Sequence, residues 1–203
     1  MMTHKHMTIR RILLAGFIVA GLFTQAQATD VAAVVKAAYE KYKDLDEGAN
    51  ADYIPALAKV DSDMFGIVVI TVDGEVYSAG DITSEVPIQS ISKVFTMARV
   101  MEDSGTEVIT DNMGVDATGQ VFNSIVAIEQ YQGQQMNPMV NPGAIAATSM
   151  IKGGSEQEIW NNIITTYNDF AGRELTVMED IYKSEADTNQ RNQALAMLMY
   201  AYG

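Results

Sequence analysis

Apolar residues recur with a helical period along most of the chain. Between Asp30 and Lys43 they stand three and four positions apart, which predicts an amphipathic helix. Ser155 and Glu158 form a capping box, which predicts a helix from there to about Ala171. The same apolar period predicts three further helices, over residues 124–132, 144–152 and 189–202.

A β-hairpin interrupts this helical pattern. Residues 65–72 are almost wholly apolar and rich in β-branched side chains, which predicts a buried strand. Asp73-Gly74 predicts a two-residue hairpin turn, after which residues 75–79 return as the partner strand. The apolar period of residues 90–102 predicts a helix that begins at Ser90. One helix, two antiparallel strands and then helices alone predict an α+β fold, in which the two strands need further strands or good cover.

Residues 1–28 have the features of an export signal. Lys5, Arg10 and Arg11 precede an apolar run over residues 12–23, and Ala26-Gln27-Ala28 has the small-x-small pattern of a cleavage site. The alternative is a membrane anchor, but the apolar run is shorter than the about 20 residues that a spanning helix needs. We therefore expect cleavage after residue 28 and a periplasmic or secreted protein.

The mature chain lacks the residues of several common enzyme mechanisms. Both histidines, His4 and His6, lie in the export signal, and the sequence has no cysteine. These absences exclude Ser-His-Asp and Cys-His mechanisms and a zinc site built on imidazole or thiolate. We therefore predict no metal and no cofactor. A nucleophilic enzyme made from this chain must use Ser, Thr, Lys or a carboxylate.

The mature chain is strongly acidic. The full sequence has 13 Lys and Arg against 26 Asp and Glu, a net charge of −13. Three of the basic residues lie in residues 1–28, so ten remain against the same 26 acids, a net charge of −16. Such a chain repels nucleic-acid phosphates and anionic lipids. We predict no nucleic-acid partner and no membrane association after cleavage; a homo-oligomer stays an open alternative.

The segment Ser90-Ile91-Ser92-Lys93 is an S-x-x-K motif. On a helix, positions i and i+3 share a face, so the Ser90 hydroxyl and the Lys93 amine can meet. Lysine is normally protonated and cannot act as a base, but burial lowers its pKa. At the start of a helix the Ser90 N–H lacks a helical acceptor and can help to hold an oxyanion.

A second S-x-x-K match, Ser149-Met150-Ile151-Lys152, is the alternative site. The motif by itself is short enough to occur by chance. Lys152 ends a predicted helix just before Gly153-Gly154, where its cation favours the C-terminal end of the helix dipole. We interpret it as a capping lysine. Ser90 instead follows a strand and opens an apolar helix, the placement that the chemistry requires.

The region around Ser90 and three later blocks resemble the bacterial glutaminases, which share the penicillin-binding-protein and β-lactamase fold. The likeness runs from about Asp30 to Gly203. At Pro142 the chain departs from the family, which usually has alanine there. The blocks are Gly80-Asp81 through Phe95, Phe122 to Val126, Asn137 to Ile145, and Ser184-Glu185 followed by Arg191-Asn192.

The resemblance implies hydrolysis of L-glutamine to L-glutamate and ammonia through a glutamyl-serine intermediate. Ser90 matches the family's nucleophile and Lys93 its base. Asn141, Glu185 and Asn192 fall where the family holds the substrate amino acid. Without the resemblance, these three would be interpreted as a turn residue, a solvated acid at a helix end and an exposed helical position.

The resemblance also implies a domain organisation. We expect residues 29–203 to form the N-terminal and helical part of a catalytic domain with a β-lactamase/transpeptidase-like fold. The family continues beyond Gly203 with the remaining antiparallel strands, substrate-contacting tyrosines and an oxyanion-hole N–H, so we expect these to be missing here.

Two other functions remain open. A penicillin-binding or β-lactamase-like serine acyl-transferase shares the S-x-x-K motif, but its K-T-G motif is absent. A helical scaffold or binding fragment that keeps Ser90 without activity is the non-enzymatic alternative.

Overall fold

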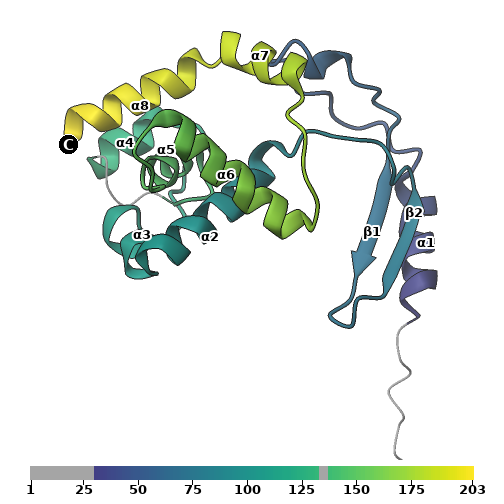
Figure 1. Cartoon of the computed structure of the whole chain (residues 1–203). Helices are drawn as coiled ribbons and strands as arrows, with labels where there is room; N and C mark the ends of the chain where they lie inside the picture. Colours follow the sequence, from purple (N-terminus) through teal and green to yellow (C-terminus); the bar gives the residue numbers. More distant parts are fainter. Residues whose placement is uncertain (1–29, 133–136) are drawn as a thin grey trace, which may run out of the picture.

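The computed structural model describes residues 30–132 and 137–203, so the predicted export signal lies outside the described residues. A hairpin with one helix forms one part of the molecule, and the other helices gather in a second part (Figure 1). The elements are α1 (Val31–Tyr42), η1 (Leu57–Lys59), β1 (Gly66–Ile70), β2 (Val76–Gly80), η2 (Gln89–Ile91), α2 (Ser92–Ser104), α3 (Glu107–Asn112), α4 (Ile125–Tyr131), α5 (Asn141–Ser149), α6 (Glu156–Ala171), α7 (Glu179–Asp187) and α8 (Gln190–Tyr202).

Helix α1 packs against the hairpin as an amphipathic helix. The Asp30 carboxylate accepts a hydrogen bond from the Ala33 N–H at 3.0 Å and so caps the helix. Tyr39 stacks on Phe65 with 5.6 Å between the ring centroids, and a side chain at Gly80 would collide with the Tyr39 ring. The predicted helix over residues 30–43 is confirmed, and its tyrosine face joins it to the sheet.

The hairpin turn is longer than the sequence predicted. The Thr71 N–H donates to the Glu75 carbonyl at 3.0 Å, which leaves three residues rather than two between the last bonded pair. Gly74 has φ of +82°, the left-handed conformation that closes a three-residue turn. The prediction of a two-residue Asp73-Gly74 turn is therefore wrong by one residue, and β2 begins at Val76 instead of residue 75.

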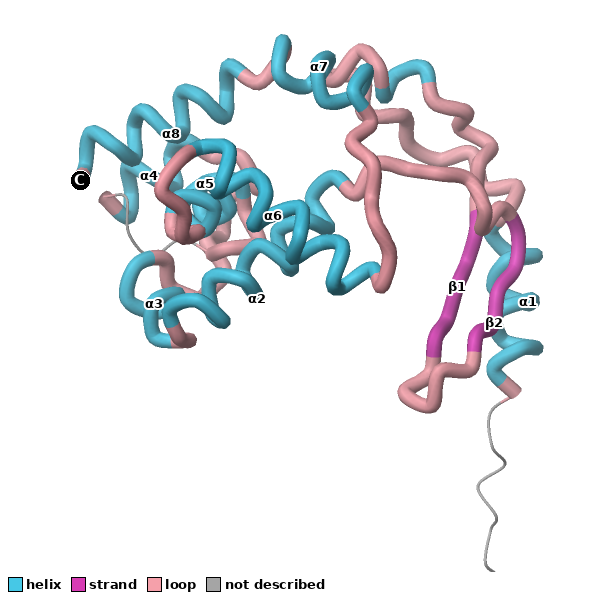
Figure 2. Tube along the Cα trace, viewed as in Figure 1, coloured by secondary structure: helices cyan, strands magenta, loops and turns pink. Residues whose placement is uncertain are grey.

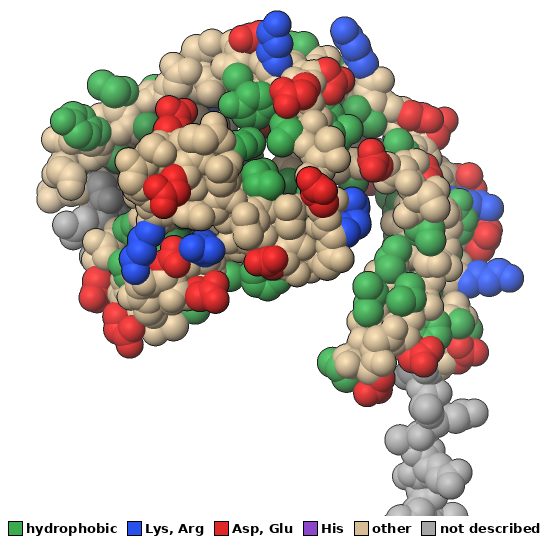
Figure 3. All heavy atoms as spheres, viewed as in Figure 1, with side chains coloured by type: hydrophobic (Ala, Val, Ile, Leu, Met, Phe, Trp, Pro, Cys, Tyr) green, Lys and Arg blue, Asp and Glu red, His purple; other side chains and the backbone are tan. Residues whose placement is uncertain are grey.

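The expected burial of the first strand is also wrong for the described residues. In the register of the two strands, Val68 pairs with Ser78 and Ile70 with Val76, and all four residues are exposed. Val68 is 50% exposed, Ile70 67% and Val76 61%. Hydrophobic side chains gather on the visible face of the hairpin in Figure 3. An apolar run shows that a strand can be buried, but whether another element packs on it depends on tertiary structure.

Helix α2 is central in the helical part, where α3, α5 and α6 pack against it. Val100 of α2 and Met113 are fully buried, and Ala147 of α5 and Ile151, just after that helix, are buried beside them. A second cluster joins Ile128 of α4 to Leu195 of α8. Figure 2 shows that helices account for nearly all regular structure outside the hairpin. The α+β class is confirmed. Within the described ranges, no helix combines the length and the apolar character needed to cross a bilayer.

Candidate active site

Ser90 lies in a tight turn in front of α2 and not in the helix itself. The turn η2 spans Gln89–Ile91, and α2 begins at Ser92, so the predicted helix start at Ser90 is wrong by two residues. Gln89 adopts φ of +46°, a left-handed conformation that is uncommon for a residue with a side chain. Ser90 is exposed, and its N–H has no hydrogen-bond acceptor among the described residues.

Lys93 lies in the first turn of α2 and is half-buried. Its Nζ donates to the Asn141 Oδ1 at 2.8 Å. Burial lowers the pKa of Lys93 from its ordinary value of 10.5. Neither an ion pair nor a hydrogen bond to Ser90 involves this lysine within the described part of the chain. Burial therefore favours the neutral form of the Lys93 amine, and the uncharged side-chain amide of Asn141 is its hydrogen-bond partner.

Asn141 is the first residue of α5, three residues before the predicted start of that helix. Its side chain also donates from Nδ2 to the Asn192 Oδ1 at 2.9 Å. Lys93, Asn141 and Asn192 thus form one hydrogen-bonded chain that joins α2, α5 and α8. These three members of the predicted site come together in the fold, although 48 and 51 residues separate the bonded pairs.

The loop before Asn141 passes very close to the start of α5. A Cβ added at Gly143 would lie 2.0 Å from the Asn137 carbonyl oxygen, so only glycine fits. Pro142 is fully buried in the first turn of the helix, where its missing N–H costs no helical bond. These two residues fix where α5 begins and thereby place Asn141.

Glu185 lies on α7, and its link to the rest of the site is weaker. Its Oε2 accepts from the Gln89 Nε2 at 3.5 Å, the long limit of a hydrogen bond. Gln89 directly precedes the candidate nucleophile, so this bond links Glu185 to the turn that carries Ser90. The described residues show no hydrogen bond from Glu185 to Lys93, Asn141 or Asn192.

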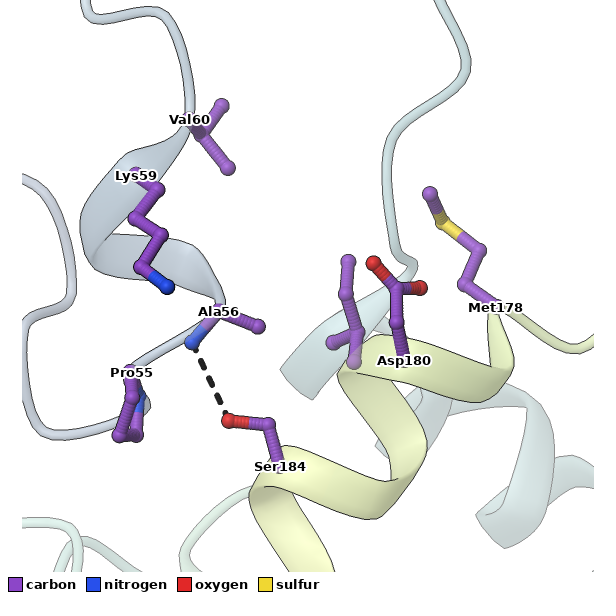
Figure 4. A pocket seen from close by; sticks show the side chains of 8 residues that line it. Pro55, Ala56, Lys59, Val60, Met178, Asp180 and Ser184 are labelled. Carbon is purple, nitrogen blue, oxygen red and sulfur yellow. Dashed lines mark hydrogen bonds between the residues drawn. The ribbon is translucent and has the colours of Figure 1, made fainter.

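An open pocket lies beside α7 (Figure 4). The Ser184 Oγ accepts from the Ala56 N–H at 3.1 Å across it and so joins α7 to the loop before η1. Neither Ser90 nor Lys93 lines this pocket, so it is separate from the hydrogen-bonded chain. Its lining residues are Pro55, Ala56, Lys59, Val60, Met178, Asp180, Ile181 and Ser184.

The second S-x-x-K match has both polar groups engaged with backbone. The Ser149 Oγ donates to the Ala146 carbonyl at 2.7 Å, and the Lys152 Nζ donates to the Asp103 carbonyl. Lys152 therefore sits at the C-terminal end of α2 and not at the end of its own helix, which ends at Ser149. The prediction that Lys152 caps its own helix is therefore wrong, because it caps α2 instead. Its cation still lies at the negative end of a helix dipole.

Sequence reasoning gave no role to Phe122, which borders the site. The Lys93 Nζ lies 5.9 Å from the centroid of its ring, and its carbonyl accepts from the Asn141 N–H at 2.7 Å. The available signal was the block from Phe122 to Val126, which supported the family resemblance without an assigned function. No group of three or more His, Cys, Asp or Glu that suits a metal ion occurs in residues 30–132 or 137–203.

The sequence model of the glutaminase family matches residues 48–203. The chain belongs to the glutaminase family. A glutaminase from Colwellia psychrerythraea (strain 34H) is 48% identical over 172 residues, which are 85% of this chain and 55% of that protein. The chain therefore spans about half the length of the curated relatives it matches.

Solved structures of glutaminases share the fold. The probable glutaminase YbaS superposes with a TM-score of 0.82 at 39% identity, over 85% of this chain and 56% of that one. The Bacillus subtilis glutaminase YbgJ, in a covalent complex with 5-oxo-L-norleucine, superposes with a TM-score of 0.70 at 28% identity, over 85% of this chain and 53% of that one. That complex formed by reaction with 6-diazo-5-oxo-L-norleucine. The resemblance to glutaminases drawn from the sequence is confirmed.

Proposed function

We propose that the full-length protein hydrolyses L-glutamine to L-glutamate and ammonia, with Ser90 as nucleophile and Lys93 as base. The observation that carries this proposal is the hydrogen-bonded chain from Lys93 through Asn141 to Asn192. This chain holds a half-buried lysine whose pKa burial lowers, three residues after the exposed Ser90, and residues 29–203 contain no histidine that could act as the base instead.

In the acylation step, neutral Lys93 takes the proton of the Ser90 hydroxyl as the oxygen attacks the side-chain amide carbon of glutamine. The carbonyl oxygen becomes an oxyanion, and the free Ser90 N–H is one donor for it. The C–N bond then breaks, and the Lys93 ammonium returns its proton to the departing nitrogen. Ammonia leaves, and the glutamyl-serine ester remains.

In the second step, Lys93 removes a proton from water, which attacks the ester carbon. The bond to Ser90 breaks, and the serine oxygen recovers a proton from Lys93. Free glutamate and the starting enzyme result. One lysine thus acts as base and then acid in each half of the reaction.

The same proposal assigns substrate binding to Asn141, Asn192 and Glu185. Amide groups can bond the carboxylate of the substrate without adding charge, and an anionic Glu185 suits its α-ammonium group. The covalent YbgJ complex supports a nucleophilic mechanism, because a diazo ketone forms a covalent adduct when a nucleophile of the protein displaces its N₂. We also propose an exported protein, periplasmic or secreted, on the basis of residues 1–28.

The test is ammonia release from L-glutamine by the full-length protein. We expect Ser90→Ala to abolish it, and Ser149→Ala, the matched control in the second motif, to retain it. Lys93→Arg should lose acylation while the protein still folds, because arginine stays protonated and cannot accept the serine proton. Labelling by 6-diazo-5-oxo-L-norleucine, followed by peptide mass spectrometry, should mark Ser90.

Two other results would contradict the proposal. If Ser149→Ala lost turnover while Ser90→Ala kept it, the second S-x-x-K would be the active one. A folded wild-type protein without any ammonia release would favour the scaffold or binding role instead.

A further inference from the structure

The segment 121–124 contacts both partners of the central hydrogen bond. The ring of Phe122 lies 5.9 Å from the Lys93 Nζ, within the range of a cation–π interaction. Its carbonyl accepts from the Asn141 N–H at 2.7 Å. Since Lys93 donates to Asn141 at 2.8 Å, the three residues form a closed triangle of contacts.

This segment is anchored on both sides of Phe122. The Ser124 N–H donates to the Val121 carbonyl at 3.1 Å, and the Ser124 Oγ caps α4 by accepting from the Ala127 N–H at 3.2 Å. The Arg191 Nε donates to the Asn123 carbonyl at 2.9 Å and so ties the segment to α8. The backbone around Phe122 is therefore fixed to the helices that carry the site.

The Phe122 side chain has little part in the hydrophobic core. It is 51% exposed, and it belongs to none of the buried clusters of the described residues. A phenylalanine half in solvent contributes much less to stability than a buried one. Core packing therefore does not explain why an aromatic ring lies next to Lys93.

We propose that Phe122 is a positioning residue for the base. Its carbonyl holds Asn141, and the face of its ring stabilises the ammonium that Lys93 becomes when it takes the Ser90 proton. In the proposed reaction the amine starts neutral, so the ring interaction is stronger in the transition state than before reaction, and such interactions raise kcat. The inference rests on the proposed hydrolysis and assigns a role that the reaction scheme itself leaves open.

The test uses Phe122→Leu and Phe122→Tyr in the full-length protein, with kcat and KM for L-glutamine as the readouts. Rates are measured at a pH where the wild-type rate no longer rises with pH, so that Lys93 is neutral before reaction. We expect Phe122→Leu to lower kcat about two- to fivefold, the loss of one exposed cation–π contact. KM should stay near the wild-type value, because the carbonyl at position 122 still holds Asn141.

Phe122→Tyr keeps the ring and should restore kcat. Val121→Ala is the matched control, since it trims an exposed apolar side chain of the same segment and leaves the Phe122 ring in place beside Lys93. Thermal unfolding of each variant checks that the fold is intact. Wild-type kcat in Phe122→Leu, or a rise in KM alone, would overturn the inference, as would a Phe122→Tyr variant as impaired as Phe122→Leu. An inactive wild-type protein would refute the proposed hydrolysis instead, so the two failures are distinguishable.

Discussion

Replacing Asn141 by aspartate changes the charge beside the base and leaves the shape almost the same. In Asn141→Asp, a carboxylate oxygen takes the place of the amide oxygen that now lies 2.8 Å from the Lys93 Nζ. At that distance, two opposite charges attract by about 1.5 kcal/mol even at the dielectric constant of water, and by more in a partly buried site. The carboxylate therefore raises the pKa of Lys93, whereas burial lowers it in the wild-type protein.

The direction of the effect on catalysis follows from the state that reacts. Only neutral Lys93 accepts the serine proton, so a raised pKa leaves a smaller neutral fraction at any pH below it. An attraction of about 1.4 kcal/mol reduces that fraction about tenfold. We expect kcat of Asn141→Asp to fall at least tenfold near neutral pH and to recover as the pH is raised.

The assay is kcat for glutamine hydrolysis as a function of pH, from neutral pH upward. Asn192→Asp is the matched control, because it places the same charge one hydrogen bond farther along the chain and leaves the partner of Lys93 neutral. Its pH profile should move less. A raised pKa of Lys93 is refuted as the cause if Asn141→Asp keeps the wild-type profile, if the loss is equal at every pH, or if Asn192→Asp moves the profile as far.

Two further predictions concern the loop before α5 and the N-terminal segment. Gly143→Ala should destabilise the protein by about 1–3 kcal/mol and raise KM for glutamine, because a Cβ there would lie 2.0 Å from the Asn137 carbonyl; chemical denaturation and steady-state kinetics measure both effects, and wild-type stability would contradict them. The exported protein should begin at residue 29, which intact-mass measurement of protein from the periplasm or medium checks; an uncleaved N-terminus there would contradict the signal assignment.

The helices with a long apolar period and a polar cap were predictable from local chemistry alone. The Ser155 hydroxyl accepts from the Glu158 N–H at 3.2 Å, as the capping box in the sequence indicates. Helix α5 begins three residues before its predicted start because two local preferences compete there. Asn141-Pro142-Gly143 has the composition of a turn, yet proline also suits the first turn of a helix, and in the fold the helix prevails.

The candidate site was only partly predictable from the residues themselves. The S-x-x-K spacing pointed to Ser90 and Lys93 without any tertiary information. The turn that moves Ser90 out of α2 depends on the left-handed backbone of Gln89, which no apolar pattern reveals. Asn141 and Asn192 have no local signature, since an asparagine in a turn or on an exposed helix face looks the same whether or not it binds a substrate. Their place was found through the resemblance to a family, and their meeting with Lys93 is a consequence of tertiary packing.

The lowered pKa of Lys93 has an energetic consequence for the fold. The unfolded chain keeps the ordinary value of 10.5, so between the lowered value and 10.5 the native state binds fewer protons than the unfolded state. Stability therefore rises with pH across that window, and the contribution is lost as the pH falls through the lowered pKa. Below it, the native state holds a partly desolvated ammonium whose only hydrogen-bond acceptor among the described residues is the neutral amide of Asn141. A carboxylate in that position would remove this cost, and by the same Coulomb attraction it would take away the neutral amine. Stability and base strength thus make opposite demands on residue 141, and asparagine satisfies the demand of the chemistry.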